Sequence, residues 1–201
     1  MITKTIASGC LTFADLQEHA TLCTACSLRS GVKGVCFGAG DPEADIMFIG
    51  EAPGFNEDLT GVPFTGRAGE VLTNIISAMG FTREQVYIAN IIKCKPPNNR
   101  DPVPHEIELC TPWLERQIDF VSPRIIYAVG KFASQFLTGQ DLPMGRMRGR
   151  LSEYKGTLVM PVWHTAYILR NPSPERKQEL WDDIIGGMQA IGLVPARGIS
   201  K

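Results

Sequence analysis

The sequence predicts an α/β protein in which helices cover both faces of a parallel sheet. Four short runs of apolar and often β-branched residues are spaced along the chain, with helical patterns between them. Buried parallel strands have this composition, and alternating strands and helices are typical of three-layer α/β/α folds. We therefore expect a central four-stranded parallel sheet within one domain of residues 1–201, a length that allows a single well-buried core.

Each of the four expected strands ends near a glycine, a proline or a polar cluster. These strands cover residues 46–49, 86–92, 124–129 and 158–162. Helical spacing of apolar residues predicts helices at about 13–22, 66–79, 104–121, 131–137 and 174–191, and Gly80 provides a stop for the second of them. Ligands of such folds bind beyond the carboxyl ends of the strands. The polar segments at residues 50–58, 90–101 and 164–174 follow strands and are the candidate site.

The charge is nearly balanced overall but uneven along the chain. The net charge is -1, and nine basic residues lie between residues 124 and 177 against three acidic ones. Such a basic face attracts phosphates, although an ordinary solvated surface explains the same charges equally well. The sequence contains no run of about 18 apolar residues and does not begin like a secretory signal, so we expect a cytoplasmic protein with no membrane span. We expect a monomer, and the sequence is silent on a sliding-clamp contact.

Six cysteines in a cytosolic chain favour a metal or cluster site over a disulfide framework. Cys23 and Cys26 form a C-x2-C turn after the first expected helix, and two further thiols, Cys94 and Cys110, lie far along the chain. Four thiolates suit zinc or an iron–sulfur cluster, and their spacing does not separate the two. The plain alternative is that Cys94 and Cys110 are small buried apolar residues. Cys10 and Cys36 are expected to be unliganded.

Two polar residues follow the first two strands. Glu51 stands in Gly50–Gly54 (GEAPG), a tight turn that is neither a phosphate-binding loop nor a nucleophile elbow. Its carboxylate can orient water or face developing positive charge, and Glu57 is a weaker candidate for that task. Asn90 carries one acceptor and two donors and can read the edge of a base. The plain interpretations are a surface glutamate and an ordinary strand-end asparagine.

An aromatic ring and an imidazole complete the candidate set. Phe64 precedes a helix, where its ring can stack on a base. His164 follows the fourth strand, and Ile168, Leu169 and Arg170 after it combine an apolar tip with a cation, as a wedge entering a DNA helix requires. The alternatives are a core phenylalanine and a loop folded onto the core.

Taken in order, these motifs resemble the family 4 uracil-DNA glycosylases, the iron–sulfur branch of the uracil-DNA glycosylase superfamily. The resemblance covers about residues 22–189. The matching strings are CTAC at 23–26, GEAPG at 50–54 with Glu57 and Asp58, PFTGRAG at 63–69, YIANIIKCKPPNNRDP at 87–102 and HTAYILRNP at 164–172.

The resemblance implies a DNA repair enzyme that hydrolyses the N-glycosidic bond of uracil in DNA. It implies a structural [4Fe–4S] cluster, held by Cys23, Cys26, Cys94 and Cys110, that ties in the N-terminal segment. It also implies a uracil pocket with Glu51 and His164 as catalytic residues and with the remaining lining from Ala52, Pro53, Phe64 and Asn90.

One position departs from the family pattern, because Thr165 stands where the family usually has proline. Threonine lacks the fixed φ of proline but offers a hydroxyl that can hold a phosphate, so we assign it to DNA binding with Ile168, Leu169 and Arg170. Two other functions fit weaker parts of the pattern. One is a cysteine-ligated hydrolase acting on nucleotides, and the other is a non-enzymatic cluster-bearing module for DNA binding or electron transfer.

Overall fold

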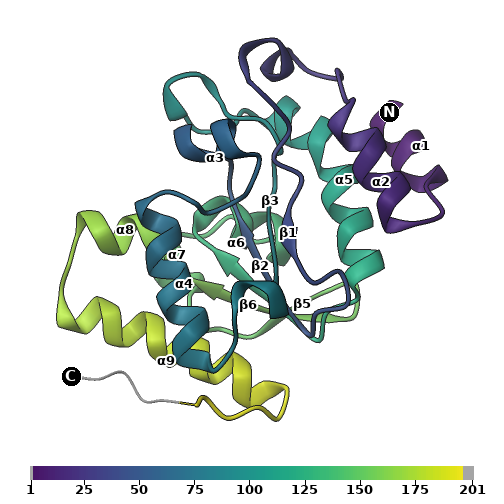
Figure 1. Ribbon diagram of the computed structural model, residues 1–201. Helices are drawn as coiled ribbons and strands as arrows, with labels where there is room; N and C mark the ends of the chain where they lie inside the picture. Colours follow the sequence, from purple (N-terminus) through teal and green to yellow (C-terminus); the bar gives the residue numbers. More distant parts are fainter. Residues whose placement is uncertain (1, 197–201) are drawn as a thin grey trace.

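The computed structural model describes residues 2–196 and is built around a six-stranded sheet (Figure 1). The strand order is β1-β3-β2-β4-β6-β5. The four inner strands run parallel, and the two edge strands pair antiparallel with their neighbours. The strands are β1 (Ala39–Gly40), β2 (Ile46–Gly50), β3 (Tyr87–Asn90), β4 (Ile125–Val129), β5 (Ser152–Tyr154) and β6 (Thr157–Val162).

The parallel centre of the sheet consists of the four strands that the sequence predicts. The edge strands β1 and β5 are missing from that prediction, so the expected four-stranded sheet is corrected to a mixed sheet of six. β1 has two residues and β5 has three, and neither is fully buried. Runs this short show no detectable alternation, and antiparallel edges on a parallel sheet are common.

Helices cover both faces of the sheet, as expected. One face packs against α4 (Arg67–Met79), α8 (Thr165–Arg170) and α9 (Pro174–Ala190). The opposite face packs against α5 (Pro104–Val121) and α6 (Lys131–Thr138). Figure 1 shows α1 (Ile2–Gly9) and α2 (Phe13–Thr21) beside α5, on the side of the molecule away from α4 and α9.

The sheet has a hydrophobic core on each face, and alternate residues of each strand contribute to one core or the other. In β2, Ile46 and Phe48 belong to the core under α4 and α9, whereas Met47 and Ile49 belong to the core under α5 and α6. All four side chains are almost completely buried. Because successive side chains of a strand point to opposite faces, a strand covered on both sides must be apolar throughout. This is why β2 is a continuous apolar run.

Helix ends agree with the expected signals where the helices are long. α4 ends at Gly80, which has φ 96°, and α5 begins with Pro104 in its first turn. The short helices were not predicted: α1, α8, α3 (Phe55–Thr60) and α7 (Met144–Met147), with 3₁₀ turns at Ser27–Gly31, Arg83–Gln85 and Pro97–Asn99. The four to six residues of α3, α7 and α8 are too few to display an apolar stripe. Among residues 2–196, no helix is long and apolar enough to cross a membrane.

Candidate active site

A cavity of about 500 Å³ opens where the parallel strands end. Pockets for small molecules measure roughly 300–1,000 Å³, so the space suits a single planar ring. Its walls come from the segments that follow β2, β3, β4 and β6. The six residues expected in the pocket all line it: Glu51, Ala52, Pro53, Phe64, Asn90 and His164.

Gly50, the last residue of β2, allows two of these side chains to converge. It pairs with Asn90 across β2 and β3. A Cβ atom at Gly50 would lie 2.5 Å from Asn90 Oδ1 and 2.5 Å from Phe64 Cζ. Real Cβ atoms do not approach other atoms this closely, so the amide and the ring can meet here only beside glycine.

The turn that carries Phe64 is held by Glu57. Phe64 has φ 54°, an uncommon conformation for a residue other than glycine. The Glu57 carboxylate accepts hydrogen bonds from the backbone N–H groups of Thr65 (3.0 Å), Gly66 (3.1 Å) and Gly54 (3.1 Å). Glu57 therefore ties the Phe64 turn to the turn after β2, a positioning role that the sequence did not reveal.

Asn90 presents its carboxamide to the cavity. The residue is buried, with 2% of its surface exposed. Within residues 2–196, the carboxamide makes no hydrogen bond, and the backbone carbonyl accepts one from Lys93 Nζ at 2.8 Å. A buried amide without partners is costly unless a ligand or water satisfies it. Its acceptor and donors are thus available for a bound molecule.

His164 is oriented by the helix that it begins. It is the N-cap of α8, and its Nδ1 accepts the backbone N–H of Ala166 at 3.1 Å. Since Nδ1 acts as the acceptor, the neutral ring carries its proton on Nε2. Its ring centroid lies 6.0 Å from that of Phe64, with the planes 25° apart. At the end of β4, a Cβ atom on Gly130 would lie 2.9 Å from His164 Cδ2, so glycine makes room for the imidazole.

The cavity displaces the pKa values of two groups in opposite directions. Burial, with a smaller contribution from Arg170, lowers the pKa of His164 to about 4. Burial, reinforced by the nearby charge of Asp101 and opposed by Arg170, raises the pKa of Glu51 to about 7. Burial disfavours the charged form of each group. At neutral pH the imidazole is therefore uncharged, and the carboxyl is near its midpoint of ionisation.

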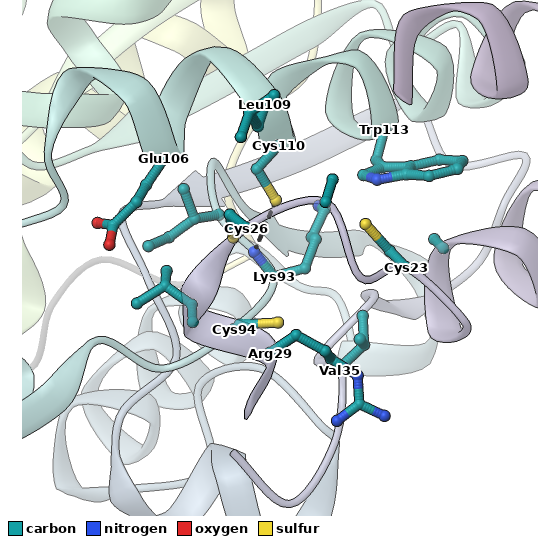
Figure 2. Close-up of a pocket in the computed structure, with 14 residues that line it drawn as sticks. Cys23, Cys26, Arg29, Val35, Lys93, Cys94, Glu106, Leu109, Cys110 and Trp113 are labelled. Atoms are coloured by element: carbon teal, nitrogen blue, oxygen red, sulfur yellow. Dashed lines mark hydrogen bonds between the residues drawn. The ribbon is translucent and has the colours of Figure 1, made fainter. Parts of the chain in front are cut away.

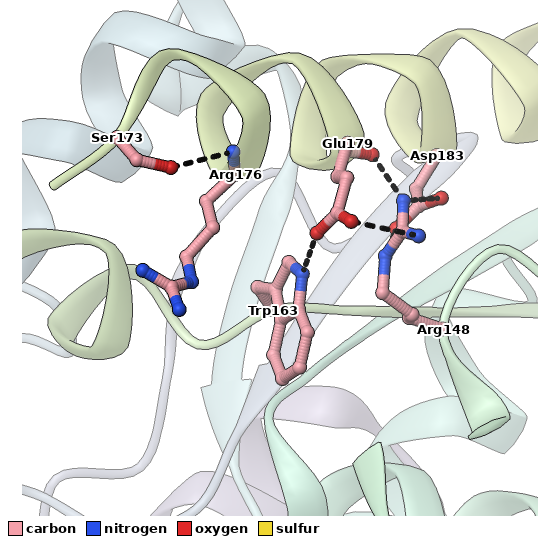
Figure 3. A network of polar contacts seen from close by, with 6 residues as sticks. All are labelled: Arg148, Trp163, Ser173, Arg176, Glu179 and Asp183. Carbon is pink, nitrogen blue, oxygen red and sulfur yellow. Dashed lines mark hydrogen bonds and ion pairs between the residues drawn. The ribbon is translucent and has the colours of Figure 1, made fainter. Parts of the chain in front are cut away.

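A second polar network holds the residue before His164 (Figure 3). Trp163 lines the cavity, donates from Nε1 to Glu179 Oε2 at 2.8 Å and stacks on Tyr167 at 4.7 Å between centroids. Beside Glu179, Arg148 makes a two-pronged contact with Asp183 at 2.7 and 2.9 Å. The contact between Trp163 and Glu179 attaches the start of α8 to α9, and the contact between Arg148 and Asp183 attaches the end of α7 to α9. They join residues far apart in sequence, so no motif indicated them.

The segment after His164 differs from the expected loop wedge. It forms helix α8, in which Thr165 is 1% and Ile168 is 4% exposed. Both side chains are packed inside the protein in this conformation. Leu169 is 37% exposed, and Arg170 is exposed and lines the cavity. The helix thus leaves Leu169 and Arg170 as the outward-facing pair.

Part of the basic last third is neutralised within the fold. Three of its cations are in ion pairs: Arg124 with Asp45, Arg148 with Asp183 and Glu179, and Lys155 with Glu115. Lys131 and Arg170 line the cavity. The positive charge available to a phosphate is therefore smaller than the sequence count suggests and lies partly at the cavity.

The four cysteines expected as ligands surround a single small pocket (Figure 2). Cys23 and Cys26 follow α2, Cys94 follows β3, and Cys110 lies in α5. All four are free thiols, and burial raises the pKa values of Cys94 and Cys110 to about 12. Within residues 2–196, no three potential ligands are close enough to bind one metal ion. The donors that line this pocket are thus four soft sulfurs.

The loop between two of these cysteines reaches the cavity. Cys94 and Cys110 bracket residues 95–109, and Pro96, Asn99, Arg100 and Asp101 of this loop line the cavity. Arg100 donates to both carboxylate oxygens of Glu106 at 2.6 and 2.9 Å, which closes the loop onto the start of α5. The thiol pocket and the cavity are therefore connected through one short segment.

Comparison with known proteins identifies the family. The model of the uracil DNA glycosylase superfamily matches residues 37–185. The chain is 38% identical over 173 residues to a type-4 uracil-DNA glycosylase of Archaeoglobus fulgidus, covering 82% of this chain and 87% of that protein. A type-4 uracil-DNA glycosylase of Thermotoga maritima is 41% identical, covering 84% of this chain and 89% of that protein. A type-4 uracil-DNA glycosylase of Saccharolobus solfataricus is 44% identical, covering 81% of this chain and 79% of that protein. The chain belongs to the uracil-DNA glycosylase superfamily, in its type-4 branch.

Proposed function

We propose that this protein removes uracil from DNA by hydrolysing the N-glycosidic bond, which releases free uracil and leaves an abasic site. Its substrates are single strands and duplexes with U·G or U·A pairs. The observation that carries the proposal is the convergence of Glu51, Phe64, Asn90 and His164 on one cavity of about 500 Å³. Membership of the type-4 branch supports the same reaction.

Recognition depends on the ring and the amide. Phe64 stacks on uracil, and the unpaired Asn90 carboxamide accepts from N3–H and donates to O4. Cytosine has an acceptor at N3 and a donor amino group at C4, so neither atom can pair with the Asn90 carboxamide as uracil does. A bidentate contact of this kind contributes about 1–3 kcal/mol of discrimination. The turn at Glu51–Gly54 lines the cavity and is our choice for the wall that excludes the methyl group of thymine.

Bond breaking requires stabilisation of negative charge on the departing base. The Nε2–H of neutral His164 donates to uracil O2 as charge develops there. One preorganised donor of this kind accounts for about 10²–10³-fold in rate. The ionised form of Glu51 positions the attacking water and faces the cationic sugar. Both residues act from strand ends, so the groups are in place before substrate arrives.

The base must leave the stack before this chemistry can begin. Leu169 fills the space left in the duplex, and Arg170 and Lys131 contact the backbone near the cavity. The exposure of Leu169 and the burial of Ile168 support this choice between the two apolar residues of α8. The chain acts as a monomeric single domain of residues 1–201.

The cofactor is a [4Fe–4S] cluster held by Cys23, Cys26, Cys94 and Cys110. Such a cluster would be bound by four cysteine thiolates, which these residues would supply. The position of the four thiols around one pocket supports a shared cofactor, and the resemblance to the iron–sulfur branch of the superfamily supports this choice over zinc. The bound cluster ties the N-terminal segment to the loop that lines the cavity. Stoichiometric iron and sulfide in the purified protein are the expected result.

The activity is tested with uracil-containing single strands and U·G and U·A duplexes, followed by alkali. The wild type should produce strand breaks at uracil and release free uracil, whereas strands with cytosine or thymine stay intact. His164→Ala and Asn90→Ala should lose about 10²–10³-fold in rate. His105→Ala and Asn74→Ala are the matched controls, because both residues are exposed and lie outside the cavity.

Two results would overturn parts of the proposal. Wild-type protein that contains its cofactor but releases no uracil from any of these substrates contradicts the reaction itself. Wild-type rates in His164→Ala or Asn90→Ala remove that residue from the mechanism and leave the reaction standing.

A further inference from the structure

Lys93 is a buried cation between the cavity and the thiol pocket. It lies three residues after Asn90 and immediately before Cys94, and only 2% of its surface is exposed. Figure 2 shows the residue among the four cysteines, and its backbone N–H donates to Cys110 Sγ at 3.2 Å. Lysine is almost never fully buried without a partner, so this position calls for an explanation.

The ammonium group of Lys93 makes two hydrogen bonds, both to neutral groups, and lies 6.0 Å from the centroid of the Phe37 ring. Nζ donates to the backbone carbonyl of Asn90 at 2.8 Å and to Gln117 Oε1 at 2.5 Å. Gln117 Nε2 in turn donates to the carbonyl of Phe37 and to the hydroxyl of Tyr87, each at 2.9 Å. The amide of Gln117 is therefore held with its oxygen toward Lys93.

No carboxylate forms an ion pair with Lys93 within residues 2–196. A buried charge without a counter-charge is expensive, because the interior solvates it poorly. Four thiolates around an iron–sulfur core carry a net negative charge, and Cys110 Sγ lies 3.2 Å from the backbone nitrogen of Lys93. Coulomb attraction between such charges is much stronger in the interior than in water.

We propose that Lys93 is the counter-cation of the cluster and also a positioning residue that links the cluster to Asn90. Its charge balances the ligated thiolates, and its hydrogen bond holds the carbonyl of Asn90, whose side chain faces the cavity. The inference rests on the proposed cofactor. It explains why a lysine stands between the last residue of β3 and the third cysteine.

Three variants separate the charge from the hydrogen bond. Lys93→Met removes both, whereas Gln117→Glu places a carboxylate against Nζ and neutralises the charge while keeping Lys93 bonded to Asn90, at the loss of the Gln117 hydrogen bond to the Phe37 carbonyl. Lys95→Met removes a partly exposed lysine on the other side of Cys94 and is the matched control. Each purified protein is analysed for iron content, for the reduction potential of the cluster and for kcat/KM on a uracil-containing single strand.

Loss of a buried positive charge should make the cluster harder to reduce, since net charge is one of the factors that set the potential. We expect more negative potentials in Lys93→Met and Gln117→Glu, and a smaller shift in Lys95→Met, whose charge is screened by solvent. Lys93→Met should also lose about 10–100-fold in kcat/KM, and Gln117→Glu should retain more activity. If Lys93→Met does not fold, Gln117→Glu still tests the charge.

The outcomes distinguish this inference from the proposal on which it rests. Wild-type protein without iron contradicts the cluster. Iron-containing wild type whose potential is unchanged in both charge variants contradicts the role of Lys93. A cluster potential that shifts while Lys93→Met keeps wild-type kcat/KM contradicts the positioning role alone.

Discussion

At the scale of single residues, we propose that Glu51 and His164 carry the chemistry, and burial displaces the pKa values of both. Burial favours the uncharged form of each, so the pKa of Glu51 rises to about 7 and that of His164 falls to about 4. A neutral imidazole donates a hydrogen bond without holding a positive charge in the cavity. Pairs of groups with displaced pKa values are typical of sites that separate acid and base roles.

The pH dependence of the reaction should therefore follow Glu51. Because the carboxyl must ionise and its pKa is about 7, kcat/KM should rise with pH through neutrality. Asp101 raises that pKa, so Asp101→Asn should move the rise to lower pH. Glu153→Gln, on the exposed part of edge strand β5, should leave the profile unchanged. Superimposable profiles for the wild type and Asp101→Asn would show that Asp101 does not act on the carboxyl.

Glu51 should also reduce the stability of the folded protein at high pH. Its folded pKa of about 7 lies above the ordinary glutamate value of 4.5, so the folded state holds a proton that the unfolded chain releases between these values. The free energy of unfolding thus falls as pH rises through this window. Glu51→Gln should have a higher Tm than the wild type at alkaline pH and the same Tm below pH 4.5, as measured by calorimetry. An equal Tm at alkaline pH is the contrary result.

At the scale of a single element, helix α8 determines which residues after His164 face solvent. Its helical geometry turns two neighbouring apolar residues in different directions, with Ile168 packed into the core under α4 and Leu169 exposed. An extended loop would have left both available to DNA. His164 at the N-cap of α8 and Trp163 before it are held by separate contacts. The element therefore positions the imidazole and the wedge residue together.

Substitutions in α8 should separate these two roles. Leu169→Ala should reduce activity on U·A duplexes more than on single strands, because only a duplex requires the space of the flipped base to be filled. Ile168→Ala should instead lower the free energy of unfolding by about 2–5 kcal/mol, as removal of buried methyl groups does. Urea titrations and parallel assays on both substrates distinguish the two effects. Equal losses on both substrates for Leu169→Ala would argue against a wedge.

At the scale of the whole molecule, the cavity is lined by residues at the ends of the sheet strands and by residues of the loop between Cys94 and Cys110. The sheet brings four strand ends to one edge, and the cysteine-bracketed loop completes the wall of the cavity. Helices α1 and α2 pack on α5 through a small third core that includes Leu16 and Trp113. The region between α2 and β1 has little regular structure, and its buried Leu28, Cys36 and Phe37 and the backbone hydrogen bond from Cys36 to Lys93 at 2.8 Å attach it to the fold.

Loss of a ligating thiol should loosen this region more than the sheet. Cys23→Ser should lower iron content and Tm, and limited proteolysis should cut residues 22–38 sooner than in the wild type. Cys10→Ser is the matched control, since Cys10 is buried but lies outside the thiol pocket, and it should retain iron. Full iron content in Cys23→Ser would remove Cys23 from the ligand set.

Local patterns were sufficient for the framework and for part of the site. The apolar runs of β2, β3, β4 and β6 and the stripes of α4 and α5 repeat often enough to be read from the chain. Edge strands and one-turn helices lack that repetition and were missed. Glu51, Asn90 and His164 were found because strand ends are predictable positions, whereas Glu57 and Glu179 act through contacts with other elements.

Alternation of strands with helices, together with residues placed at strand ends, was already enough to predict a parallel α/β framework and a pocket at one edge of its sheet. Which of Ile168 and Leu169 faces outward depends on how α8 packs against α4, and the burial of Lys93 depends on Gln117 arriving from α5. These properties arise from contacts between distant segments. Periodicity records which face of an element is apolar, but burial and electrostatic environment exist only once separate elements enclose the same space.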